Sequence, residues 1–390
     1  MISNRPQAGS LVPAAASLGV VGLVFAVLLG SGDWPRFWAS YLVAVLFCTS
    51  LALGALFMVL VHFATRAGWS VVVRRLAEHL AGTLPVISVL FLPVLILALP
   101  DLYAWARPGE VAGDPILQEK RAYLNTAFFR LRALAYLIAW SLMAWWFRRQ
   151  SLRQDEQEGF HPTRRLQAAS GPSLVVLSLA VTFAAFDWIM SLDPHWWSSV
   201  FGVYFFSGCM VAAYAFLPLA VFAAQRSGQI TGEITSEHFH DLGKMLFAFV
   251  VFWAYIAFSQ FLLIWYGAIP QETEWYAHRL QPGWRSLTVA LAVGHFVVPF
   301  LLLLSRHVKR KKAALAAISA WMLAVHYLDL YWLVVPSVAE GGFRPLLLDA
   351  ALLLGLGGLT LSALGRLIRG RALVPVQDPR LEESLSLENI

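Results

Sequence analysis

Titratable side chains inside long apolar runs are the residues of this chain with the clearest capacity for chemistry. His326 and Asp329 lie three residues apart in such a run, so a helix would place them on one face, within hydrogen-bonding reach. A histidine beside a carboxylate exchanges protons near neutral pH. The pair therefore predicts a site of proton uptake or release.

Other polar residues extend a proton route along the chain. Tyr255 and Ser259 are four residues apart, and Gln260 adjoins them, so bound water would let them relay protons. The remaining candidates are ionisable groups in or beside apolar runs, namely His62, Lys244 and His295. The alternative is that these groups only join helices, through hydrogen bonds of about 0.6–2 kcal/mol each.

The densest cluster of such groups lies in residues 186–199, where Asp187, Asp193 and His195 occur among tryptophans. Tryptophans at this level can form an ordinary membrane-interface belt. Two carboxylates and a histidine are more than a belt needs, and they indicate proton exchange with the external phase or a quinone-headgroup pocket. The candidate quinone contacts are Arg130, Arg132, Asp187 and His195.

Bound haem and metal are not expected. His62, His295 and His326 lie singly in three different apolar runs, whereas a di-haem four-helix site needs paired histidines on each of two helices. The two cysteines, Cys48 and Cys209, belong to no CxxC or CxxCH motif. The sequence therefore predicts no metal site, no covalently bound cofactor and no catalytic residue of its own.

These residues belong to a chain that is too apolar for a water-soluble protein. Of its 390 residues, 59% are hydrophobic and 13% are charged, whereas soluble domains carry about 25% charged residues. The composition predicts an all-α integral membrane protein and excludes a disordered chain, a disulfide scaffold and a soluble enzyme. The net charge of +6 does not indicate nucleic-acid binding, because basic excess in membrane proteins usually marks cytoplasmic loops.

Ten apolar runs are long enough to cross a lipid bilayer as helices. They cover residues 12–30, 37–63, 82–100, 125–147, 173–191, 199–224, 243–266, 286–305, 314–336 and 346–367. The first could instead be a signal peptide, but no clear cleavage site follows it, which favours a retained helix. Most of the 29 Lys and Arg residues lie at the N-terminus, after even-numbered spans and in the tail, which predicts cytoplasmic termini.

The arrangement of the spans follows from a weak internal repeat. Span 5 ends in Phe-Asp-Trp before Pro194, and span 9 ends in Leu-Asp-Leu-Tyr-Trp before Pro336. Spans 2–5 and 6–9 are therefore expected to form two four-helix bundles, with spans 1 and 10 peripheral. The corresponding domains are 1–36, 37–191, 192–336 and 337–390.

Two segments outside the spans also carry predictions. Residues 69–79 alternate Trp and Val with Arg74, Arg75 and Glu78, which is typical of an amphipathic helix lying in the membrane interface. The polar tail at 375–390 is expected to be loosely ordered.

The stretch FDWIMSLDPHWWSSVFGVYFFSG (186–208) resembles a known family. It is similar to the NrfD/polysulfide-reductase-like membrane subunits of bacterial alternative complex III, a quinol oxidoreductase whose acceptor is cytochrome c or a copper protein. Within that complex the similarity is to the second such subunit, the ActF type. Further similar stretches are 37–78, YLNTAFFRLR (123–132), 242–276 and HYLDLYW (326–332).

The resemblance implies a haem-free subunit of the bacterial inner membrane, with a proton route and a degenerate pocket for menaquinone or another quinone, while the main quinol site belongs to the paralogous subunit. The implied partners are a paralogous NrfD-like membrane subunit, a periplasmic iron–sulfur subunit, c-type cytochrome subunits and a terminal oxidase. The family's acidic and histidine positions correspond to Asp187, Asp193, His195, His326 and Asp329.

Two alternatives remain open. An ion- or proton-coupled secondary transporter would also have repeats and buried charges, but Pro218 and Pro299 do not occupy matching places in the two sets of spans. An inert scaffold subunit of the same complex would have the same ionisable groups without using them.

Overall fold

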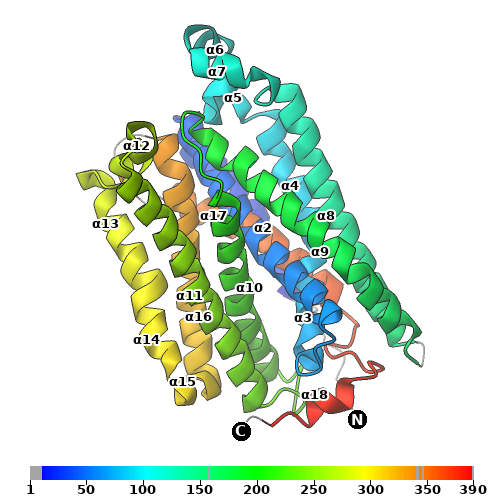
Figure 1. Cartoon of the computed structure of the whole chain (residues 1–390). Coiled ribbons are helices and arrows are strands. Elements are labelled where there is room, and N and C mark those ends of the chain that lie inside the picture. Colours follow the sequence, from blue (N-terminus) through cyan, green and yellow to red (C-terminus); the bar gives the residue numbers. More distant parts are fainter. Residues whose placement is uncertain (1–10, 157–158, 340–341, 345–346, 389–390) are drawn as a thin grey trace.

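The computed structural model describes residues 11–156, 159–339, 342–344 and 347–388. Within these ranges the chain is helical, without strands, and ten segments are long and apolar enough to cross a membrane (Figure 1). This confirms the predicted all-α membrane class. The spanning segments comprise α1 (Leu11–Gly30), α2 (Trp34–Ala64), α3 (Val71–Ala81) with α4 (Leu84–Ile96) and α5 (Leu99–Leu102), α8 (Thr126–Gln154), α9 (His161–Trp188), α10 (Phe201–Arg226), α11 (Ser236–Gly267), α13 (Pro282–Leu291) with η4 (Ala292–Val297) and α14 (Val298–Leu304), α16 (Lys312–Val334) and α17 (Leu347–Ile368).

Short helices lie between the spans and in the C-terminal tail. They are η1 (Ala104–Ala106), α6 (Pro108–Gly113), α7 (Pro115–Glu119), η2 (Lys120–Ala122), η3 (Met190–Leu192), α12 (Pro270–Arg279), α15 (Arg306–Arg310), η5 (Val335–Ser337) and α18 (Leu381–Leu385). In Figure 1, α6 and α7 lie beyond one end of the spanning helices, and α18 lies at the opposite end.

Several spanning helices are longer than their apolar runs. The helix α9 begins at His161 rather than near 173, and α11 begins at Ser236 rather than near 243. The side chain of Thr235 caps α11 in a capping box with His238. Hydropathy detects only the apolar part of a helix. The helical hydrogen bonds continue into the polar residues beyond it wherever a cap satisfies the helix end.

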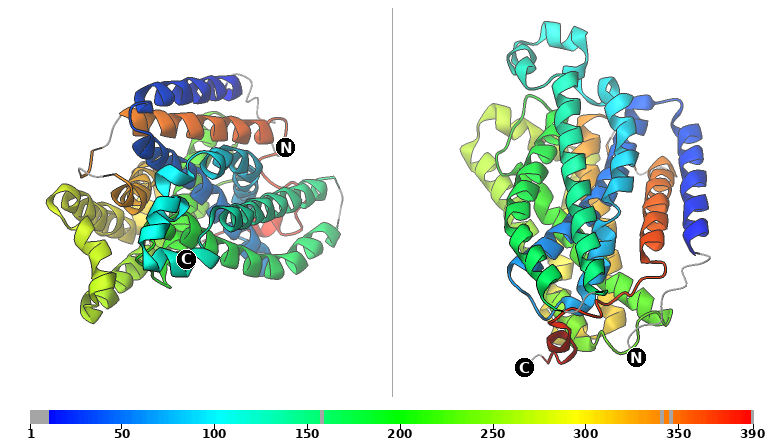
Figure 2. Two further views of the ribbon diagram at one scale, coloured as in Figure 1. Left: turned by 90° about the horizontal axis from the view of Figure 1, so that it is seen from above. Right: turned by 90° about the vertical axis from the view of Figure 1, so that its right-hand side faces the viewer.

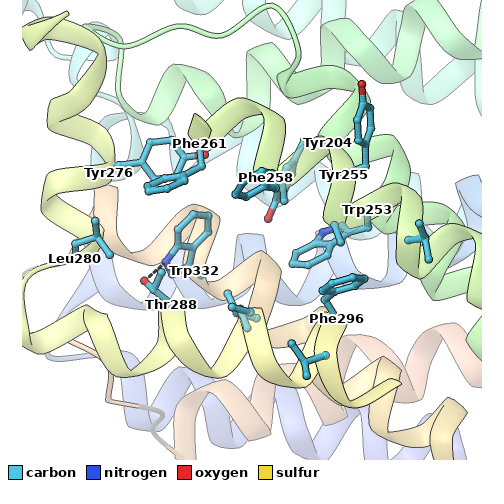
Figure 3. A pocket seen from close by; sticks show the side chains of 16 residues that line it. Tyr204, Trp253, Tyr255, Phe258, Phe261, Tyr276, Leu280, Thr288, Phe296 and Trp332 are labelled. Carbon is cyan, nitrogen blue, oxygen red and sulfur yellow. Dashed lines mark hydrogen bonds between the residues drawn. The ribbon is translucent and has the colours of Figure 1, made fainter. Parts of the chain in front are cut away.

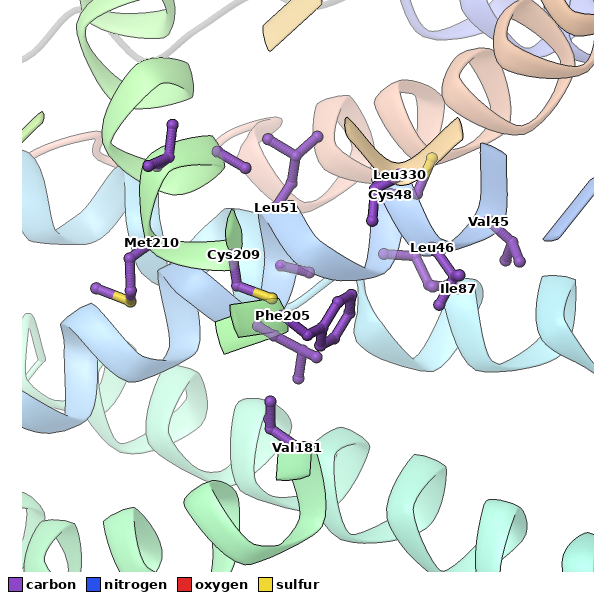
Figure 4. Close-up of a cluster of buried hydrophobic side chains, with 14 of the residues drawn as sticks. Val45, Leu46, Cys48, Leu51, Ile87, Val181, Phe205, Cys209, Met210 and Leu330 are labelled. Carbon is purple, nitrogen blue, oxygen red and sulfur yellow. The ribbon is translucent and has the colours of Figure 1, made fainter. Parts of the chain in front are cut away.

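The helix α2 lies in the middle of the molecule, in contact with α3, α4, α9, α10, α16 and α17. Gly54 allows its closest crossing, because a Cβ atom there would lie 2.1 Å from the carbonyl oxygen of Cys209 in α10. Around this crossing Leu51, Phe205 and Cys209 pack in an apolar core (Figure 4). The close approach of the α2 and α10 backbones at Gly54 therefore contributes to the packing of this core, together with the large side chains.

The helix contacts join both predicted sets of spans. The helices α2, α4, α8 and α9 contact one another in sequence around a ring, and so do α10, α11, α13–α14 and α16. The same α2 also contacts α10 and α16. The division into two four-helix bundles, with its domain boundaries, therefore stays a prediction.

The two end spans pack on each other at the side of the molecule (Figure 2). Glycines line their contact: a Cβ on Gly22 of α1 would lie 2.8 Å from the amide nitrogen of Gly355 in α17. Gly358 approaches Gly19 in the same way. The glycines of these two spans thus allow close helix contact.

The segment expected to lie in the membrane interface is instead buried. All residues of α3 are buried, and its arginines pair with acids from elsewhere in the chain: Arg74 with Asp378 of the tail, and Arg75 with Asp155 at 2.6 Å. Ser384 of α18 donates a 2.7 Å hydrogen bond to the carbonyl oxygen of Trp69. The expectations of an interfacial helix and a loose tail are wrong, because the tail and the end of α8 supply partners for the polar face of α3.

Candidate functional site

The side chain of Asp329, in α16, is 1% exposed and lies between neutral hydrogen-bond donors. The hydroxyl of Tyr204, in α10, donates to its Oδ1 atom at 2.6 Å. The indole Nε1 of Trp253, in α11, donates to its Oδ2 atom at 3.1 Å. Three helices thus meet at one carboxylate, and both of its oxygens have partners.

The hydroxyl of Ser50, in α2, lies next to the ring of His326. Its oxygen is 2.8 Å from the carbonyl oxygen of Phe47 and 2.9 Å from Nε2 of His326, so a hydroxyl that donates to Phe47 can accept from Nε2–H. The Nδ1 atom of His326 then has a free lone pair, and it is buried without a hydrogen-bond partner in the described chain. In this tautomer His326 has a buried acceptor at Nδ1.

The structure brings His295 beside His326 and Asp329. The hydrogen bond expected between His326 and Asp329 is absent from the described residues, because Tyr204 and Trp253 take both oxygens of the carboxylate. The His295 ring is 0% exposed and stacks on Trp253, with 3.8 Å between ring centroids. Its two ring nitrogens have no hydrogen-bond partner among the described residues. One ligand-type atom from each of His295, His326 and Asp329 lies within 4.8 Å of the others. Such spacing could admit a metal ion, but the two donors on Asp329 favour a hydrogen-bonded carboxylate.

Two local backbone features bring these side chains together. Gly208 leaves room for His326, because a Cβ there would lie 2.9 Å from its Cε1 atom. His295 lies in the π-helical turn η4, whose Gly294 carbonyl oxygen accepts a 2.8 Å hydrogen bond from Trp321. Single π-turns within helices recur at functional sites because they reorient side chains.

An apolar cavity of about 570 Å³ lies beside this cluster, between α11 and α13–α14 (Figure 3). Tyr204 and Trp253, the two donors to Asp329, belong to its wall. Its other lining side chains are mostly aromatic or aliphatic and include Phe258, Phe261, Tyr276, Leu280, Thr288, Phe296 and Trp332. The volume lies within the range of about 300–1,000 Å³ that is usual for small-molecule pockets.

The predicted relay residues of α11 lie on different faces of that helix. Tyr255 is 65% exposed at the edge of the cavity, with its hydroxyl directed away from it, and Ser259 is half-buried (Figure 3). Gln260 is buried, accepts a 2.9 Å hydrogen bond from Ser198 and donates one of 3.0 Å to Tyr276. Gln260 thus contacts the cavity wall through Tyr276, whereas Tyr255 faces outward.

Asp187 forms a separate, charge-compensated site at the end of α9. Arg132, in α8, donates from Nη2 and Nε to its two oxygens at 2.8 and 2.9 Å, and Tyr136 donates at 2.9 Å. Arg130 instead donates to the carbonyl oxygen of Leu95, near the end of α4. None of the candidate quinone contacts predicted from the sequence lines the described aromatic cavity.

Asp193 and His195, the other two titratable residues of the 186–199 stretch, lie nearer the surface. The Nε2 atom of His195 lies 2.5 Å from Oδ2 of Asp114, in the segment before α7. Burial would raise the pKa of Asp114, but the hydrogen bonds from His195 and from two backbone N–H groups lower it. Asp193 begins the turn that contains His195, and the carbonyl oxygen of Pro194 accepts a 2.5 Å hydrogen bond from Lys120.

Lys244 and His62 lie toward the other end of the helices, where α18 packs. Lys244, near the start of α11, pairs with Asp241. His62 is buried near the end of α2, with its ring 5.4 Å from that of Trp69. Neither lies in the central cluster, so a route from them to Asp329 stays a prediction.

Four residues that shape the central cluster were not predicted from the sequence: Ser50, Tyr204, Gly208 and Trp253. Tyr204 and Gly208 lie in the 186–208 stretch and Trp253 lies in the 242–276 stretch, so the motifs contain them. Within an apolar run, however, the sequence does not distinguish a functional aromatic residue or glycine from one that only packs between helices. The sequence matches no protein-family model and no curated protein, so the family resemblance rests on these motifs.

Proposed function

We propose that this chain is the haem-free membrane subunit of a quinol-oxidising respiratory complex, in which it provides a quinone pocket and part of a transmembrane proton route. One observation carries the proposal: Tyr204 and Trp253 line the aromatic cavity and also hold Asp329 by hydrogen bonds. Only the side chains of Tyr204 and Trp253 would separate a quinone ring bound in the cavity from the buried carboxylate of Asp329.

The chemistry of quinol oxidation suits this arrangement. Oxidation of a quinol releases two protons with its two electrons, so the pocket needs acceptors for protons in a place without bulk water. Asp329 offers a carboxylate, and His326 offers a lone pair on Nδ1. Aromatic side chains such as Phe258, Phe296 and Trp332 supply flat apolar walls for a quinone ring.

The electron carriers in this proposal belong to partner subunits. The sequence lacks Cys motifs for iron–sulfur clusters or c-type haem, so the electrons would pass to an iron–sulfur subunit and c-type cytochromes, beside a paralogous NrfD-like subunit and a terminal oxidase. The same proposal places the chain in the bacterial inner membrane with both termini in the cytoplasm. Menaquinone or another quinone is the proposed substrate.

Two alternatives compete with this proposal. A proton-coupled transporter would use the same buried groups, but the cavity has an almost wholly apolar lining, which suits an apolar ring better than a polar solute. In an inert scaffold, the hydrogen bonds to Asp329 would only join α10, α11 and α16.

A substitution that fills the cavity tests the proposal. Ala257 lines the cavity, whereas Ala248 lies on the exposed surface of the same helix. In the purified complex, Ala257→Trp is expected to raise the KM for quinol or abolish turnover, and Ala248→Trp to leave both unchanged. Wild-type quinol kinetics in an assembled Ala257→Trp complex would refute a quinone pocket at this cavity.

A further inference from the structure

A second cavity, of about 860 Å³, opens at the end of the molecule where the C-terminal tail packs. Three arginines from different elements line it: Arg66 follows α2, Arg164 lies in the first turn of α9, and Arg380 belongs to the tail. Thr163 and Gln167 add polar groups to its wall. None of these residues lines the aromatic cavity, so a ligand bound here would be independent of the proposed function.

Among the described residues, one of these three arginines has a carboxylate partner. Arg380 pairs with Glu383, with hydrogen bonds of 2.7 and 2.8 Å. Within the described residues no ion pair joins Arg66 or Arg164 to a carboxylate. The first turn of α9 contains no acidic residue, although the N-terminus of a helix favours negative charge. The cavity therefore suits an anion.

The backbone conformation of Arg66 indicates that its side chain has a function. Arg66 has φ +54, in the left-handed region that glycine adopts without strain. This conformation ends α2, where the N–H of Ala67 donates to the carbonyl oxygen of His62 at 2.9 Å. A glycine would end the helix equally well. An arginine here has a strained backbone conformation, and strain of this kind often occurs where the side chain has a function.

An apolar surface leads away from the arginines along α9. Arg164, Ala168, Gly171, Val175 and Leu179 follow one another at helical spacing on one face. Val175 is 61% exposed and Leu179 is 56% exposed. A Cβ atom on Gly171 would meet nothing within 4 Å, so this face has no neighbour there. A ligand with an anionic head and an apolar tail would match both surfaces.

We propose that this cavity binds the phosphate group of an anionic membrane lipid, whose acyl chain lies along the outer face of α9. Arginine guanidinium groups bind phosphate oxygens in pairs of hydrogen bonds, and basic pockets at the ends of spanning helices suit anionic headgroups. A free phosphate ion would satisfy the arginines but would leave the row from Gly171 to Leu179 unused. The two surfaces together favour a lipid.

The test uses the full chain, purified in detergent and stripped of lipid, with binding followed by native mass spectrometry. Phosphatidylglycerol and cardiolipin are expected to bind at least about tenfold more tightly than phosphatidylcholine, since the arginines add charge-assisted hydrogen bonds. The double variant Arg66→Gly with Arg164→Gln is expected to lose this preference. Arg165→Gln, whose residue lies in the same turn outside the cavity lining, is the matched control and should keep it.

Arg66→Gly separates lipid binding from folding, because glycine removes the charge and relieves the backbone at the same position. A variant that keeps its thermal stability and loses lipid binding supports the proposal. Equal binding of phosphatidylglycerol by the double variant and the wild type would overturn it. Binding of inorganic phosphate or of short-chain phosphatidylglycerol as tight as that of the long-chain lipid would also overturn it. The outer face of α9 would then contribute nothing to binding.

Discussion

The hydroxyl of Tyr204 donates a 2.6 Å hydrogen bond to Asp329 across the interface of α10 and α16. Asp187, which corresponds to Asp329 in the repeat predicted from the sequence, is instead held by the guanidinium of Arg132 at 2.8 Å. Both aspartates are fully buried, but Asp187 has a positively charged partner, whereas Asp329 has only neutral hydrogen-bond donors. This difference predicts different responses to the same substitution.

Asp329→Asn is expected to leave the protein folded and to lower quinol turnover by at least about tenfold, because the amide cannot take up a proton. Its oxygen can still accept from Trp253, and its NH₂ group can donate to the hydroxyl oxygen of Tyr204, so only the hydroxyl proton of Tyr204 loses its acceptor. Turnover and the proton-to-electron ratio of the assembled complex are the measurements. Wild-type values for both would show that the carboxylate is structural.

Asp187→Asn is expected to destabilise the fold by about 3–5 kcal/mol, because Arg132 would keep its charge without a counter-ion. Thermal unfolding in detergent measures the change. Combining it with Arg132→Gln should recover part of the loss, since the unpaired charge is then removed. If the double variant is no more stable than Asp187→Asn alone, the ion pair is not the cause.

Gly208→Ala is expected to destabilise the protein by about 1–3 kcal/mol and to displace the His326 ring, because the new methyl group would lie 2.9 Å from its Cε1 atom. Gly357→Ala, in α17, is the control. A Cβ there meets nothing within 4 Å, so helix propensity should stabilise it by about 0.5–1 kcal/mol. Comparing both by thermal unfolding tests the close approach of α10 and α16.

Asp378→Asn is expected to cost about 1–3 kcal/mol and to loosen the tail, because Arg74 would lose its partner from that segment and keep Glu78. Limited proteolysis of the C-terminus and thermal unfolding measure the two effects. Glu382→Gln, an exposed change in the same tail, should be close to neutral. Equal protease sensitivity of the two variants would contradict a tail held by its ion pair with α3.

Acid is expected to loosen the start of α7. The lowered pKa of Asp114 means that its carboxylate stabilises the fold above its ordinary pKa, and that this contribution is lost as the pH falls through the lowered value, below about pH 4. Amide hydrogen exchange at Ile116 and Leu117, which donate to Asp114, measures the loss. The amide of Phe128, capped by the non-titrating Asn125, should stay protected over the same range.

Much of the architecture could be predicted from the sequence. Apolar runs such as 199–224 must be helices if they cross a bilayer, because each backbone N–H and C=O group then finds its partner within the same segment. The spacing of His326 and Asp329 likewise placed them on one face of one helix. Both inferences depend only on residues near each other in the chain.

The tertiary structure decided which of the polar groups meet. His295 joins His326 through a π-turn and the absence of a side chain at Gly208, and neither feature has a hydropathy signal. Asp187 and His195, eight residues apart, take different partners, Arg132 and Asp114. Helix periodicity fixes the direction of a side chain around its own axis, whereas the group that it meets depends on how distant helices cross. That crossing is a property of the packed chain.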